Sequence, residues 1–174
     1  LTLSGLEALD NLVKKTKLAF EDGIKQLAQH GITLIEDTDH TYNKAFFAKR
    51  LDLHQCIHQQ DLPTIASIYL NESWSQVITQ LRSLSNLQNK TKGLIGLSIH
   101  TEQDTKLTIY EYVKAIAISR ILCTTIPNIS CPLTSIPSNR GKLTLNNNQL
   151  LPQEKTFPLC LLAGANDIHH IYLN

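Results

Sequence analysis

The stretch FPLCLLAGAND, residues 157–167, decides the predicted fold, because seven apolar residues run into a small-residue turn that carries an amide and a carboxylate. Apolar runs without alternation are typical of parallel strands that helices cover on both faces. We therefore predict a buried strand over residues 157–163. In parallel sheets ligands bind beyond the carboxyl ends of the strands. The predicted cofactor-binding residues follow this strand and are Gly164, Ala165, Asn166 and Asp167.

An alternative for the same turn is structural. Asn166 or Asp167 would then only cap the helix that follows the strand. Under this alternative the turn connects two elements and contacts no ligand.

In the chain that precedes this stretch, strand and helix signals alternate at a regular step. Predicted strands begin near residues 32, 63, 93, 128 and 157, which are separated by 31, 30, 35 and 29 residues. Each step matches the size of a βαβ unit. Helices are predicted between them, one of them starting at a capping box formed by Ser73 and Gln76. The result is an α/β fold, either the C-terminal five βα units of a TIM-like (β/α)8 barrel or an open doubly wound parallel sheet.

Composition excludes several classes of protein. The net charge is +1, with both signs spread along the chain, so nucleic acid and anionic membranes are not expected partners. No apolar run approaches the roughly 20 residues that span a bilayer. The four cysteines lack CxxC spacing, which predicts a cytoplasmic protein with free core thiols. Because the chain has no methionine and begins at Leu1, we expect it to be a piece of a longer protein.

Three motifs in order carry a resemblance to a known family. They are HQCIHQQDLPTIASI (residues 54–68), EYVKAIAISRILCTTIPNIS (residues 111–130) and LAGAND (residues 162–167). Together they resemble the C-terminal half of the radical S-adenosylmethionine enzymes of the futalosine route to menaquinone. The family comprises aminofutalosine synthase and cyclic dehypoxanthinylfutalosine synthase. The resemblance implies that residues 1–174 are the C-terminal part of one radical SAM barrel domain.

The resemblance also implies cofactors and a reaction. The cofactors would be S-adenosylmethionine and a [4Fe-4S] cluster, with a small-molecule substrate and an electron donor for the cluster. The three cluster cysteines of the family follow its first barrel strand, and this chain has no such motif, so the fragment alone would be inactive. The expected activity is that of aminofutalosine synthase, whose 5′-deoxyadenosyl radical adds to an enolpyruvyl benzoate. The alternative is the cyclase, whose radical abstracts a ribose hydrogen.

Barrel geometry selects further site residues, because side chains at the carboxyl ends of the strands meet at one mouth. His100, in the segment SIHTEQDT, resembles the histidine of the family's FHPENT segment and is the predicted catalytic residue. A neutral imidazole there can exchange a proton with substrate. A solvated loop histidine is the alternative. The predicted substrate-binding residues are Glu36, Tyr69 and Asn71.

His54 and His58 lie four residues apart, which is the spacing of a metal-binding pair. No HExxH glutamate accompanies them. We therefore predict no metal site and expect both histidines on the outer face of a barrel helix.

Two departures from the family support an alternative of another class. The family's glycine-rich PGGGAE turn falls on EDTDHT, residues 36–41, which has no glycine. Between the last two strands, an Asn-rich stretch replaces the family's helix. A degenerate, non-catalytic remnant or interaction subunit that keeps the scaffold is therefore the alternative.

Overall fold

The described residues form an α/β fold around one parallel sheet. The computed structural model describes residues 2–16, 19–37, 44–70, 73–101, 107–132 and 152–167. The elements, in chain order, are β1 (Thr2–Ser4), α1 (Leu6–Thr16), α2 (Phe20–Gln29), β2 (Leu34–Glu36), α3 (Lys44–His58), β3 (Thr64–Tyr69), α4 (Trp74–Thr91), β4 (Leu94–His100), α5 (Ile109–Leu122), β5 (Asn128–Ser130) and α6 (Pro152–Leu162).

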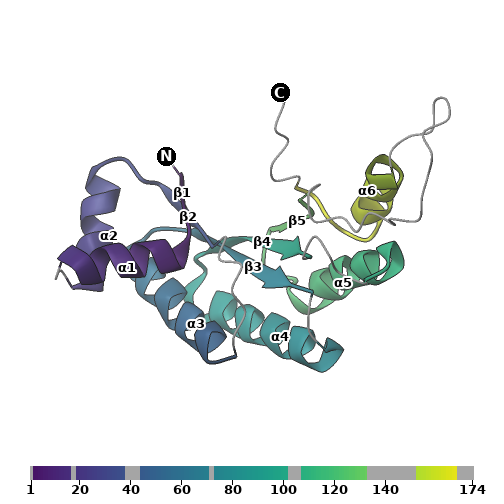
Figure 1. Ribbon diagram of the computed structural model, residues 1–174, viewed down its shortest axis with the longest axis horizontal. Coiled ribbons are helices and arrows are strands. Elements are labelled where there is room, and N and C mark those ends of the chain that lie inside the picture. The colour runs from purple at the N-terminus through teal and green to yellow at the C-terminus, as the bar shows by residue number, and fades with distance from the viewer. Residues whose placement is uncertain are drawn as a thin grey trace.

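The strands of the sheet follow the order of the chain, β1-β2-β3-β4-β5, and every neighbouring pair is parallel. A parallel bridge between Ser130 and Asp167 adds one more position beside β5. Parallel strands in sequential order, joined by crossovers of one hand, have their connecting helices on one face of the sheet. In Figure 1, α3, α4 and α5 lie on the same side of β3 and β4. A doubly wound sheet requires a reversal of strand order, and the described strands contain none.

Two apolar clusters fix the helices on this face. The larger cluster joins β3, β4 and β5 to α4 and α5 through residues such as Ile68, Ile99 and Ile129. The smaller cluster joins Ile35 of β2 to α1, α2 and α3. Because alternate residues of a strand point to opposite faces, the residues between these apolar positions point away from the helices.

The predicted capping box is confirmed. Gln76 accepts the backbone N–H of Ser73, as expected for the capping box at the start of α4. Gly31 has φ of +86°, the conformation expected of a glycine just after a helix. The sequence pattern did not reveal β1, so the strand beginning near residue 32 is not the edge of the sheet.

The prediction of a strand over residues 157–163 is wrong, because this stretch belongs to α6. Cys160 is fully buried, whereas Leu159, Leu161 and Leu162 are exposed. A short apolar run cannot by itself distinguish a buried strand from a helix segment. The segment that follows α6, and not the run itself, supplies the bridge to β5.

Gly164 ends α6 as a helix cap. Its φ is +108°, its N–H donates to Leu161 O at 3.0 Å, and the N–H of Ala165 donates to Cys160 O at 2.9 Å. This pair of bonds is the Schellman motif, in which glycine is favoured because a left-handed backbone strains other residues. A Cβ on Gly164 would also lie 3.0 Å from Cγ of Arg120. The glycine is therefore explained by backbone geometry.

Gly164→Ala should lower the free energy of unfolding by about 2–3 kcal/mol, because left-handed strain adds to crowding against Arg120. Gly31→Ala is the matched control, since Gly31 also has positive φ but has no atom within 4 Å of the added Cβ. We expect about 1 kcal/mol for the control. Urea unfolding measures both values. Equal losses in the two variants would show that Arg120 yields to the new Cβ without cost.

Candidate functional site

The face of the sheet that points away from α3, α4 and α5 carries a row of buried serines. Ser67 of β3, Ser98 of β4 and Ser130 of β5 are register partners, and each is at most 1% exposed. The Oγ of Ser98 makes no hydrogen bond within the described part of the chain. Buried hydroxyls normally have partners, so this row is a polar surface suited to a ligand that hydrogen-bonds.

His100 and Tyr69 close the carboxyl ends of β4 and β3 on the same face. They are register partners, and their rings stack with centroids 5.0 Å apart at 20°. Both side chains are buried, at 8% and 3% exposure. Glu36, at the end of β2, is also buried and points to this face because its neighbour Ile35 packs against the helices. The predicted residues Glu36, Tyr69 and His100 therefore occupy one face, while Asn71 lies outside the described residues.

Ser67 determines which nitrogen of His100 carries hydrogen. The Ser67 hydroxyl donates its single hydrogen to the backbone oxygen of Asp37. Its Oγ also lies 3.4 Å from Nε2 of His100, and with its hydrogen already donated it can only accept there. Nε2 of His100 is therefore the nitrogen that donates toward Ser67.

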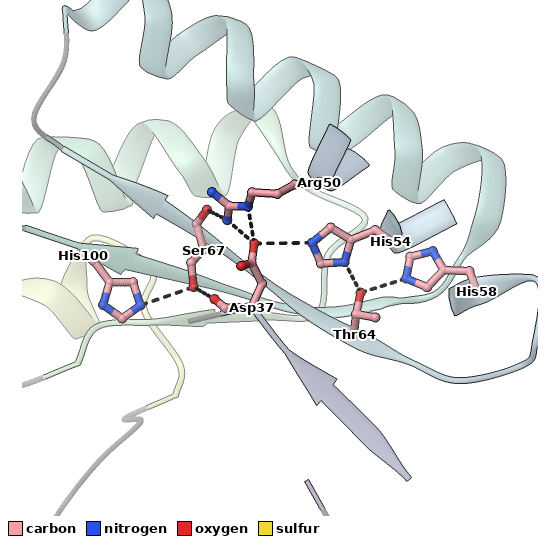
Figure 2. Close-up of polar contacts among 7 residues, drawn as sticks. All are labelled: Asp37, Arg50, His54, His58, Thr64, Ser67 and His100. Atoms are coloured by element: carbon pink, nitrogen blue, oxygen red, sulfur yellow. Dashed lines mark hydrogen bonds and ion pairs between the residues drawn. The ribbon is translucent and has the colours of Figure 1, made fainter. Parts of the chain in front are cut away.

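Behind the sheet, Asp37 forms a buried ion pair that Figure 2 shows together with its neighbours. Nε of Arg50 donates to Asp37 Oδ2 at 2.6 Å, and Nη2 donates to the same oxygen. Nη2 also donates to Ser67 O at 2.9 Å. Asp37 and Arg50 are 0% and 3% exposed. The guanidinium thus connects α3 to the end of β2 and to the middle of β3.

His54 and His58 extend this cluster along α3, and the expectation that they lie on an outer helix face is wrong. They are 1% and 9% exposed. His54 Nδ1 and His58 Nε2 each lie 2.8 Å from Thr64 Oγ1, at the start of β3. His54 Nε2 lies 3.6 Å from Asp37 Oδ2. The physical reason is that both imidazoles have polar partners inside the fold, the Thr64 hydroxyl and the Asp37 carboxylate. These contacts offset the free-energy cost of burying a polar ring.

Two pKa values in the cluster are lowered. Burial and, to a smaller extent, the charge of His54 together lower the pKa of His58 from 6.5 to about 4. For Asp37, burial would raise the pKa, but the hydrogen bond from His54 and the charges of Arg50 and His54 lower it below its usual value. His58 is therefore neutral and Asp37 ionised at neutral pH.

Of the four predicted cofactor residues, the structure brings Asp167 to the carboxyl end of a strand, opposite the last residue of β5, and leaves Gly164, Ala165 and Asn166 away from the strand ends. Asp167 bridges to Ser130 and is level with the serine row, and the three residues before it lie toward the amino ends of the strands. Gly164 O accepts Nε and Nη2 of Arg120 at 3.0 and 2.8 Å. Asn166 Oδ1 accepts the N–H of Ile129 at 2.8 Å, so its amide extends the sheet. Through these contacts residues 164–166, which follow α6, connect α6 to α5 and β5.

Arg50, Thr64 and Ser67 were not among the predicted site residues. A usable signal was present for Arg50, because Arg50, His54 and His58 follow each other at four-residue steps and so share one helix face. The serines gave no such signal. Their role depends on register between strands, which is a non-local property.

Comparison with known proteins assigns the chain to no family, and the geometry of its potential ligands assigns no metal site within the described residues. No protein-family model matches the chain, and no curated protein matches it. Within the described ranges, no group of three histidine, cysteine or acidic side chains could hold a metal ion, and the four cysteines are free. None of the described helices is both long and apolar enough to cross a membrane.

The lowered pKa values predict acid lability. A histidine whose pKa is lower in the folded state stabilises the fold fully above the unfolded pKa of 6.5, and this contribution is lost as pH falls toward 4. We expect about 2 kcal/mol less stability at pH 4.5 than at pH 7 from His58, with a further loss below pH 4 as Asp37 protonates. Urea unfolding across this range measures it.

The variant His58→Gln isolates this contribution, and His30→Gln, which changes an exposed histidine after α2, is its control. The dependence of stability on pH between 7 and 4.5 should be weaker in His58→Gln and unchanged in His30→Gln. Identical pH profiles for His58→Gln and the wild type would contradict the assignment.

Proposed function

We propose that this chain is part of a (β/α)8 barrel and carries a small-molecule site on the polar face of its sheet. The observation that carries the proposal is the buried group formed by Ser67, Tyr69, Ser98 and His100 at and before the carboxyl ends of β3 and β4. Sequential parallel strands with helices on one face support the barrel. In barrels of this kind, conserved chemistry sits at the carboxyl ends of strands, which is where His100 lies.

In the proposed site His100 exchanges a proton with the substrate. Since Nε2 carries the hydrogen that reaches Ser67, Nδ1 is the nitrogen that would accept a proton. The stacked ring of Tyr69 and the contact to Ser67 hold the imidazole in one orientation. A fixed orientation is what a general base requires.

We propose further that the reaction belongs to the radical S-adenosylmethionine class, as part of aminofutalosine synthase, with the cyclase as the alternative. The support is the ordered set of sequence motifs together with the parallel sheet. The described residues do not fit the cluster, since they offer no three-ligand group. Gly164 also offers no space for S-adenosylmethionine, because the Arg120 side chain lies where a Cβ on this glycine would point. A cluster would need ligands other than the described residues.

A non-catalytic remnant or interaction subunit is the second candidate. The observation that favours it is the segment EDTDHT, which lacks the glycines of the family's turn. The coding sequence upstream of Leu1 discriminates the candidates. An in-frame CxxxCxxC segment supports the enzyme, whereas a start codon close to Leu1 supports the remnant.

His100→Ala should lower turnover by about 10²-fold or more, because a positioned acid–base group typically contributes that much. The assay uses the protein extended by its cluster-binding segment, reconstituted anaerobically, with S-adenosylmethionine and an enolpyruvyl benzoate as substrates. His30→Ala is the matched control and should keep full turnover. Full turnover by His100→Ala would remove His100 from the site, and a wild type that forms no product would reject the proposed reaction.

A further inference from the structure

Independently of that reaction, an unassigned chain of hydrogen bonds runs behind the sheet from solvent to His54, whose Nε2 lies 3.6 Å from Asp37 Oδ2. It begins at a pocket of about 260 Å³ between α3 and α4, whose lining includes His58, Lys90 and Thr91. Thr91 Oγ1 lies 2.7 Å from His58 Nδ1. Beyond His58 the chain passes through Thr64 and ends at His54, next to the carboxylate, as Figure 2 shows.

The single hydrogen on each threonine hydroxyl gives the chain two directions. Thr64 Oγ1 contacts two imidazole nitrogens, so it donates to one and accepts from the other. Thr91 Oγ1 has Leu87 O at 2.9 Å as a second acceptor for its hydrogen. When Thr91 donates to Leu87, His58 must donate from Nδ1. When Thr91 donates to His58, His58 must donate from Nε2.

Following both directions to the end shows that they differ by one proton. In the first, Thr91 donates to His58 Nδ1, Nε2 of His58 donates to Thr64, and Thr64 donates to His54 Nδ1. His54 is then neutral, with its hydrogen on Nε2 toward Asp37. In the second, Thr91 donates to Leu87 and every bond between Thr91 and His54 is reversed. Nε2 of His54 still faces the Asp37 carboxylate and keeps its hydrogen, so His54 then carries hydrogen on both nitrogens.

We propose that this chain is a proton relay that takes up one proton at the His58 pocket and places the charge on His54 beside Asp37. A proton from water in the pocket passes to Thr91 Oγ1, and the hydroxyl proton that Thr91 already carries passes to His58 Nδ1, which leaves Thr91 with one hydrogen directed to Leu87 O. The Nε2 proton of His58 passes to Thr64, and the Thr64 proton passes to His54 Nδ1. One proton is consumed, and His58 is neutral before and after.

The charges around the relay set what the added proton does. Among the described residues, the charged groups facing it are Asp37 after β2, Arg50 on α3 and Lys90 on α4. Asp37 and Arg50 balance each other before uptake. After uptake, the Asp37 carboxylate has two cationic neighbours, Arg50 and His54. We therefore expect acid to weaken the ion pair between Arg50 and Asp37. Through the relay, the strength of the ion pair that joins α3 to the sheet depends on the pH of the solvent.

The side-chain ¹⁵N resonances of His54 and His58, followed by NMR from about pH 8 to pH 5 in the 174-residue chain, test the relay. The expected result is that His58 changes from the Nε2–H to the Nδ1–H tautomer without becoming charged. His54 should become charged at the same midpoint. Independent titration does not produce this joint change. A His58 that keeps one tautomer while His54 titrates, or two separate midpoints, would overturn the relay.

Three threonine variants sharpen the test. Thr64→Val removes the shared hydroxyl, so the His58 tautomer should no longer follow His54, whereas Thr64→Ser keeps a hydroxyl and should restore the coupling. Thr79→Val is the matched control, because the exposed Thr79 hydroxyl donates to Ser75 O at 2.8 Å, within its own helix and away from both histidines. Persistent coupling in Thr64→Val would overturn the proposal. If Thr64→Val does not fold, the wild-type tautomer change together with Thr64→Ser still decides it.

Discussion

The structure depends most on the carboxylate of Asp37, because two elements approach it where β2 ends. A buried charge is costly unless it is paired and hydrogen-bonded, and Arg50 meets both conditions through two bonds to one oxygen. The same guanidinium also bonds Ser67 O, so one cation holds the end of β2 and the middle of β3 against α3. Breaking such a pair by removing one partner leaves an uncompensated charge, which typically costs more than the pair contributes.

Ser67 joins this buried pair to the opposite face of the sheet. Its carbonyl is held by Arg50, and its hydroxyl is held by the backbone of Asp37 and faces His100. The orientation of the imidazole in the proposed site is therefore linked to an ion pair on the helix side. The sheet thus has apolar contacts on its helix-facing side and buried hydroxyls on the other side. The proposed function rests on the polar face, and the proton relay rests on the helix side.

Local sequence signals predicted much of the fold. Features that depend on contacts between distant parts of the chain could not be predicted from them. Four of the five predicted strands exist with small shifts at their ends, and the helices between them were found from caps and periodicity. The apolar run before Gly164 was assigned to a strand because seven residues are too few to separate the two periods, and the glycine was interpreted as a ligand contact although it caps a helix. His100 and Tyr69 were placed correctly at strand ends. The serine row, by contrast, depends on register, and the burial of His54 depends on a threonine ten residues away on a neighbouring strand.

The free energy of unfolding of Arg50→Met tests the central role of the ion pair most directly. Methionine keeps most of the volume of arginine and removes its charge, so the carboxylate of Asp37 would stay buried without its main partner. Lys14→Met is the comparison, because Lys14 forms an ion pair with Asp10 at 2.7 Å but is 62% exposed. We predict a loss of about 3–5 kcal/mol for Arg50→Met and less than about 1 kcal/mol for Lys14→Met. An Arg50→Met variant as stable as Lys14→Met would contradict the account.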